Sequence, residues 1–188
     1  MMAGGFVLTG GSSRRMGRDK ATLPYRGFTL VESVAAEVRA AAGNVTLVGA
    51  PERYAHLGIP VMTEDFPDCG PMSGVEAALR QTFAQWNLIV ACDMPGIRHE
   101  WLSDLLRFAA LHPATGAVVP VSPDGRLHPL CAAWHVRAQG RLRESLEAGK
   151  FKLVNALDEI GFVSYRPEWA ASLRNVNTPE EWGASASA

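Results

Sequence analysis

The sequence predicts an α/β fold in three layers, with a mostly parallel central sheet and helices on both of its faces. Three observations predict it. Short apolar runs alternate along the chain with longer segments of helical periodicity. The apolar runs are rich in Val and Ile and show little polar alternation, as in strands that are covered on both sides. A glycine-rich loop follows the first run, and sheets of this kind bind ligands beyond the carboxyl ends of their strands.

Strands are predicted at residues 5–8, 44–48, 59–62, 86–91, 117–121 and 130–134. Helices are predicted over residues 29–42, 71–84, 100–111 and 136–148, with a last helix from Pro179 onward. In the first helix, Leu30, Val34 and Val38 share one face at helical spacing. The last helix has a clear beginning, because Thr178 is a good N-cap and Glu181 completes a capping box.

Length and composition limit the classes of protein to consider. A chain of 188 residues, 47% apolar and 20% charged, predicts a single domain over residues 1–182, followed by a disordered Ala/Ser tail at 183–188. The net charge of −1 argues against a nucleic-acid partner. Three cysteines without a C-x-x-C pair argue against a disulfide framework and against zinc or iron–sulfur sites. Without a signal-peptide core or a membrane-length apolar run, a cytoplasmic protein with no membrane partner is expected.

The first loop has the composition of a polyphosphate site. Gly10 and Gly11 follow the first strand, and glycines let backbone N–H groups approach a ligand closely. The loop also carries four cations against the single carboxylate of Asp19, namely Arg14, Arg15, Arg18 and Lys20. The spacing fits neither the P-loop, which needs Gly followed at once by Lys, nor the dinucleotide fingerprint G-x-G-x-x-G. The alternative interpretation is a solvated basic turn.

A second signal is the acid that ends a buried strand. The apolar run 86–91 is followed by Cys92-Asp93-Met94-Pro95, in which the proline stops further regular structure. The carboxyl ends of parallel strands meet at one edge of the sheet, so Asp93 is expected beside the first loop. Magnesium typically bridges such a carboxylate to substrate phosphates. The alternative interpretation is a turn-forming or helix-capping Asp.

The loop from Leu8 to Lys20 reads L-x-G-G-x-S-x-R-M-G-x-D-K, with Thr9 in place of the usual Ala. It resembles the signature of the molybdenum cofactor guanylyltransferases, which have a Rossmann-like nucleotidyltransferase fold. The resemblance implies that Leu8, Thr9, Gly10, Gly11 and Lys20 contact the nucleotide and that Arg15 stabilises charge in the transition state. The C-D-M-P sequence resembles the magnesium-binding motif of the same family, which implies that Asp93 holds Mg²⁺.

Three weaker motifs resemble the family as well. Asp65, in an E-D pair, is implied to lie at the nucleotide, although a surface turn explains it equally well. Asn175 and Asn177, in N-x-N-T-P-E-E, are implied to bind the pterin-bearing substrate or to order the site; loop architecture is the alternative. His128, in H-P-L, is a candidate for contact with the second substrate, although a satisfied polar group at the start of a strand is the commoner role.

The resemblance implies a specific reaction, in which the terminal phosphate of molybdopterin attacks the α-phosphorus of GTP and pyrophosphate leaves. A phosphate monoester with a second pKa of about 6 is already ionised, so no side-chain base is required. The two glycines after Thr9 favour guanine over cytosine. However, Gly49 occupies a place where guanine-using relatives often carry Asn. Molybdoenzymes or their chaperones are the implied recipients of the product.

Three alternatives stay open at this point. One is a cytidylyltransferase acting on the same cofactor, and another is a sugar-1-phosphate nucleotidyltransferase, against which the short chain argues. The third is a non-enzymatic carrier of the cofactor, against which the presence of both Lys20 and Asp93 argues.

Overall fold

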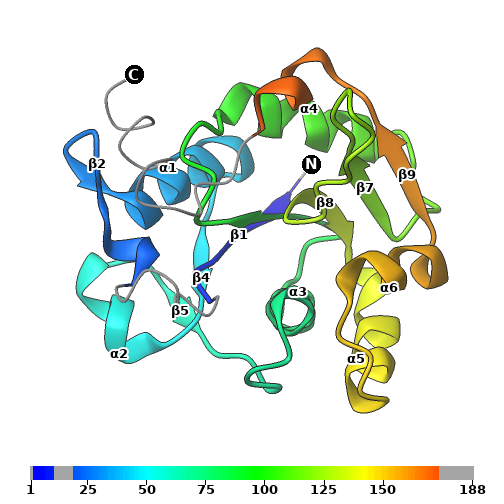
Figure 1. Ribbon diagram of the computed structural model, residues 1–188, viewed down its shortest axis with the longest axis horizontal. Coiled ribbons are helices and arrows are strands. Elements are labelled where there is room, and N and C mark those ends of the chain that lie inside the picture. Colours follow the sequence, from blue (N-terminus) through cyan, green and yellow to red (C-terminus); the bar gives the residue numbers. More distant parts are fainter. Residues whose placement is uncertain (1, 11–18, 174–188) are drawn as a thin grey trace.

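The structure, a computed structural model, describes residues 2–10 and 19–173, and its centre is a seven-stranded sheet in the order β5-β4-β1-β6-β8-β7-β9 (Figure 1). The strands of this sheet are β1 (Ala3–Leu8), β4 (Thr46–Val48), β5 (Val61–Met62), β6 (Trp86–Ala91), β7 (Ala117–Pro120), β8 (Cys131–His135) and β9 (Phe162–Tyr165). A separate hairpin joins β2 (Pro24–Tyr25) to β3 (Phe28–Thr29). All pairings in the large sheet are parallel except those of β8, which confirms the predicted fold class.

Helices cover both faces of the sheet (Figure 1). On one face lie α1 (Leu30–Ala42) and α4 (His99–Ala110), and on the other lie α3 (Pro71–Gln81), α5 (Gln139–Glu147) and α6 (Leu153–Ile160). Side chains of a strand alternate between faces, so β1 contributes to two cores. Val7 packs with the α1 and α4 side, whereas Phe6 and Leu8 pack with the α3 side.

Shorter segments complete the connections. The single turn of α2 (Pro51–Tyr54) follows β4, and 3-10 turns are formed by η2 (Lys20–Thr22), η3 (Ala55–Leu57), η4 (Val136–Ala138) and η5 (Glu168–Ser172). At the start of α1, Thr29 and Glu32 form a capping box, which fixes where the helix begins. Its end is fixed by Gly43, which has the left-handed conformation that glycine adopts without strain (φ 81°).

The predicted elements differ from the observed ones in several places. Besides the short elements β2, β3 and α2, two longer elements were not predicted: β9, a half-exposed edge strand, and α6, whose buried Leu153, Ala156 and Leu157 do follow helical spacing. The predicted helix 136–148 begins as the 3-10 turn η4 before α5. The predicted helix 71–84 ends at Gln81, because Thr82 is extended and its hydroxyl bonds the buried Asn87. The helix expected from Pro179 and the tail 183–188 lie outside the described residues.

The register of β1 determines what meets at the carboxyl edge of the sheet. Leu8 lies opposite Val48 of β4 and Ala91 of β6. On the far side of β6, the antiparallel β8 begins at this same edge, where the Leu130 carbonyl accepts a hydrogen bond from Ala91 N at 2.8 Å. The first loop, the segment after β6 and the β7–β8 connection therefore all start at neighbouring strand ends.

Candidate active site

The first loop begins beside Asp93. The Leu8 carbonyl accepts a hydrogen bond from Cys92 N at 3.0 Å, so the parallel ladder continues to the last residue before Asp93. Thr9 and Gly10 leave β1 at this point, and Asp93 follows β6 with a partly exposed side chain. Two predicted site segments that are far apart in the sequence are thus neighbours at the sheet edge.

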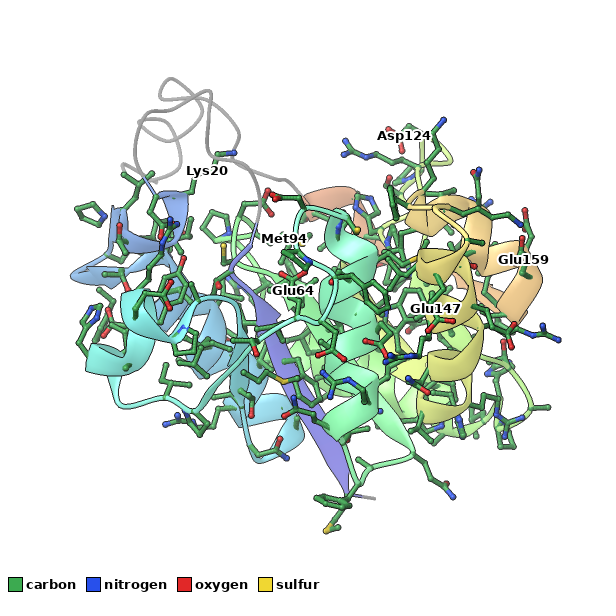
Figure 2. All side chains as sticks on the ribbon, turned by 90° about the horizontal axis from the view of Figure 1, so that it is seen from below. Lys20, Glu64, Met94, Asp124, Glu147 and Glu159 are labelled. Carbon is green, nitrogen blue, oxygen red and sulfur yellow. The ribbon has the colours of Figure 1, made fainter. Side chains whose placement is uncertain are left out.

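The end of the first loop returns to the same place. Asp19 and Lys20 lead into η2, and their charges reach the buried thiol of Cys92. Burial and the carboxylates of Asp93 and Asp19 raise the pKa of Cys92 to about 12, whereas the Lys20 ammonium opposes that rise. Cys92 therefore lies within the electrostatic field of both predicted functional charges, Lys20 and Asp93. Figure 2 shows Lys20 and Met94, the residue after Asp93, at the end of the molecule toward which β1 runs.

Thr9 and Gly49 are sterically coupled. The N–H and the hydroxyl of Thr9 both donate to the Val48 carbonyl, at 3.0 and 2.9 Å, which holds the side chain over the end of β4. A Cβ atom on Gly49 would lie 2.0 Å from the Thr9 Oγ1, which is closer than two non-bonded heavy atoms can approach. Thr9 and Gly49, the two departures from the family pattern, are therefore sterically dependent on each other. With Thr9 present, position 49 has no room for a side chain that could read a base.

Of the two acids after β5, Glu64 is the one that faces the first loop. Its Oε1 lies 3.1 Å from where a Cβ on Gly10 would be, and burial raises the pKa of its carboxyl group. The carboxylate of Asp65 instead pairs with Arg80 at 2.9 Å and with Arg143 at 3.5 Å, on the α3 and α5 side. Sequence reasoning singled out Asp65 and missed Glu64, although the same E-D pair contained the signal.

His128 lies in the connection between β7 and β8, which adjoins β6 at the sheet edge. Its buried ring is within 3.0 Å of the Ser122 hydroxyl, and that hydroxyl donates to Asp124 at 2.5 Å. Burial and the nearby Arg126 lower the pKa of His128, so the ring is neutral at pH 7. It can thus offer one donor and one acceptor but no charge, and Ser122 already occupies one ring nitrogen.

A magnesium ion would suit Asp93. Mg²⁺ keeps several waters and takes one or two carboxylates together with substrate phosphates, and the partly exposed Asp93 at the end of β6 could supply such a carboxylate. Within residues 2–10 and 19–173, the one close group of three His or acidic side chains is Glu37, His99 and Glu100. That group lies between α1 and α4, where His99 N and Nδ1 both bond Glu37, at 2.6 and 2.9 Å.

Several predicted site residues fall outside the part of the chain that the structure describes. They are Gly11 and Arg15 in the first loop and Asn175 and Asn177 near the carboxyl end. Their roles stay predictions. Among the described part of the chain, the sheet edge thus brings together Leu8, Thr9, Gly10, Lys20, Glu64 and Asp93.

The strand ends thus bring together a candidate nucleotide site at the carboxyl edge of a mostly parallel sheet, and comparison with known proteins shows the family of the chain. Residues 5–160 match the model of the MobA-like NTP transferase domain. A probable molybdenum cofactor guanylyltransferase from Bacillus licheniformis is 35% identical over 161 residues, covering 82% of this chain and 79% of the relative. One from Carboxydothermus hydrogenoformans is 30% identical, covering 94% and 91%. The chain belongs to the molybdenum cofactor guanylyltransferase family and is a nucleotidyltransferase.

Solved structures share the fold at lower identity. Molybdopterin-guanine dinucleotide biosynthesis protein A from Archaeoglobus fulgidus superposes with a TM-score of 0.83 at 24% identity, over 99% of this chain and 97% of that one. The 2-C-methyl-D-erythritol 4-phosphate cytidylyltransferase from Thermus thermophilus gives 0.72 at 16% identity, over 97% and 96%. These likenesses establish the architecture. No helix within residues 2–10 and 19–173 has the length and hydrophobicity needed to span a bilayer.

The steric coupling of Thr9 and Gly49 yields a prediction for stability. Gly49→Ala alone should lower the free energy of unfolding by about 1–3 kcal/mol, because the new methyl group overpacks against Thr9. In a Thr9→Ala background the same substitution should cost less than about 0.5 kcal/mol. Urea denaturation of the four proteins in this cycle measures the coupling.

Gly140→Ala is the control for this cycle, because its Cβ would have open space around it. It should change stability equally with Thr9 and with Ala at position 9. Equal losses from Gly49→Ala in both backgrounds would show that the two residues are not coupled.

Proposed function

We propose that the protein transfers GMP from GTP to the terminal phosphate of molybdopterin, giving the guanine dinucleotide cofactor and pyrophosphate. The observation that carries this proposal is the convergence of Lys20 and Asp93 on the same strand end, around Cys92. Relatives of 30% identity or more over most of their length are probable molybdenum cofactor guanylyltransferases, which supports the choice of substrates.

In this reaction, an oxygen of the terminal phosphate of molybdopterin forms a bond to the α-phosphorus. The bond between that phosphorus and the oxygen bridging to the β-phosphate breaks, and pyrophosphate leaves with the electron pair. The attacking phosphate is ionised near neutral pH, with a second pKa of about 6, so no protein base is needed. The protein must mainly bring two polyanions together, which requires positioning and neutralisation of charge.

Each residue of the candidate site has a proposed role. Lys20 binds the phosphates, and Arg15 stabilises the charge that develops in the transition state. Asp93 would hold Mg²⁺, which supplies positive charge at the phosphates when bound. The backbone of Leu8, Thr9, Gly10 and Gly11 would line the nucleotide, with glycines allowing close approach.

The acceptor would lie on the other side of Asp93. His128 is a candidate contact from the β7–β8 connection, which flanks β6 on the side away from β1. Asn175 and Asn177, which lie outside the described residues, are further candidates by the family resemblance. Molybdoenzymes or their chaperones would receive the product, and the cytoplasm is the expected location.

Guanine is the proposed base of the donor nucleotide, and CTP is the alternative. Gly49 offers no side chain, so another group must read the base. Guanine presents two adjacent N–H donors at N1 and N2, which suit a carboxylate because it only accepts hydrogen bonds. The position of Glu64 beside Gly10 supports Glu64 for this role, whereas the family resemblance supports Asp65.

Release of pyrophosphate tests the proposed reaction. With Mg²⁺ and GTP, wild-type protein should release pyrophosphate only when molybdopterin is added, and CTP should replace GTP poorly. Asp93→Asn and Lys20→Ala should each lower kcat/KM by about 10²–10³, because each removes a charge that acts on the phosphates. Lys150→Ala serves as the control, since Lys150 lies in the exposed α5–α6 connection, where it pairs with Glu159 at 3.7 Å.

Full turnover by Asp93→Asn would contradict the metal assignment. Turnover with CTP in preference to GTP would favour the cytidylyltransferase alternative. Binding of the cofactor without any release of pyrophosphate would favour the carrier alternative.

The roles of the two acids can be separated with inosine triphosphate, which lacks the N2 amine of guanine. If Glu64 accepts hydrogen bonds from the guanine edge, Glu64→Gln should reduce the preference for GTP over inosine triphosphate about tenfold. Asp65→Asn should leave that preference unchanged, because Asp65 already pairs with Arg80 and Arg143. The converse result would assign base recognition to Asp65.

A further inference from the structure

Tyr54, at the end of α2, is a buried phenol whose hydroxyl bonds a residue of the first loop. The side chain is 2% exposed, and its hydroxyl donates to Asp19 Oδ2 at 2.7 Å. Burial and the hydrogen bond to Asp19 raise the pKa of the phenol, so it remains a neutral donor at physiological pH. The reaction described above gives this group no role.

Asp19 in turn fixes the turn that contains Lys20. Its Oδ1 accepts from Ala21 N at 3.1 Å, and its backbone carbonyl accepts from Thr22 N and Thr22 Oγ1, at 3.3 and 2.9 Å. Lys20 is the first residue of η2, directly between Asp19 and Ala21. Asp19 therefore holds the turn that contains Lys20 with both its carboxylate and its backbone carbonyl.

The Tyr54 ring packs against backbone that is hydrogen-bonded to the sheet. Its Cε2 lies 3.3 Å from where a Cβ on Gly49 would be, so the ring packs closely over the backbone after β4. Gly49 N donates to the Met62 carbonyl at 2.9 Å, which ties that backbone to β5. Through the Tyr54 hydroxyl, Asp19 is therefore linked to the backbone at the end of β4. The Asp19 carboxylate also forms a longer ion pair of 3.7 Å with Arg53, whose side chain is 64% exposed, so solvent screens this contact.

We propose that Tyr54 is a positioning residue for the nucleotidyl-transfer site: through Asp19, it holds Lys20 where the triphosphate binds. Lys20 has four rotatable side-chain bonds, so its ammonium is well placed only if its backbone is fixed. Two negative charges, those of Asp19 and Asp93, lie near the same thiol as Lys20, and an Asp19 freed from Tyr54 could compete with phosphate for that ammonium. This inference rests on the proposed function.

Binding of Mg-GTP, measured by calorimetry, tests the inference without the acceptor. Tyr54→Phe keeps the ring and removes only the hydroxyl, and we expect about tenfold weaker binding. The matched control is Tyr165→Phe, because the Tyr165 hydroxyl also bonds a carboxylate, that of Asp104, from the edge strand β9. It should lose comparable thermal stability and bind Mg-GTP as the wild type does.

A double-mutant cycle separates positioning from a merely structural role. If Tyr54 acts through Lys20, Tyr54→Phe should weaken binding less than twofold in a Lys20→Ala background. A full tenfold loss there, or wild-type affinity of the Tyr54→Phe single variant, would overturn the inference. Failure of the wild-type protein to bind Mg-GTP would instead refute the proposed function.

A second variant covers the case in which Tyr54→Phe does not fold. Asp19→Ala removes the acceptors of both Tyr54 and Ala21 N, so neither hydrogen bond can form. It should weaken Mg-GTP binding at least tenfold in the wild-type background and less than twofold with Lys20→Ala. Unchanged affinity in this variant would also overturn the inference.

Discussion

The parallel pairing of β1 with β6 is the constraint on which the rest of the site depends. It sets Leu8 opposite Ala91, and the next hydrogen bond, from Cys92 to Leu8, carries the ladder to the residue before Asp93. A shift of register by one residue would turn every side chain of β1 to the other face. It would also exchange the two cores that Val7 and Leu8 join. Packing on both faces therefore fixes the position of the glycine loop relative to the acid.

The sequence concentrates positive charge in one short segment of a chain that is nearly neutral overall. The net charge is −1, yet four cations lie between residues 14 and 20. Burial is the main cause of the elevated pKa of Cys92; acids from both segments add to the rise, and Lys20 opposes it. A site that brings two polyanions together needs this local balance, because strongly positive charge elsewhere would attract other anions without helping the reaction.

The sequence predicted those features that depend on local periodicity or on motifs at strand ends. The runs of β1 and β6 are continuous and apolar, so their burial and the placement of the residues after them followed directly. The pairs that tune the site could not be predicted in this way. Thr9 meets Gly49 and Asp19 meets Tyr54 only because the chain reverses between strands, and no spacing rule links such positions. Glu64 and Asp65 differ by one residue, and only the backbone direction after β5 decides which acid faces the loop.

The most direct test of the account is a crystal structure of the protein with Mg²⁺ and an unreactive GTP analogue. We expect the triphosphate to lie between the first loop and Asp93, with a carboxylate oxygen of Asp93 about 2.0–2.1 Å from the metal and the Lys20 ammonium on the phosphates. A triphosphate bound away from the ends of β1 and β6, or a metal held at Glu37, His99 and Glu100 in its place, would contradict the account.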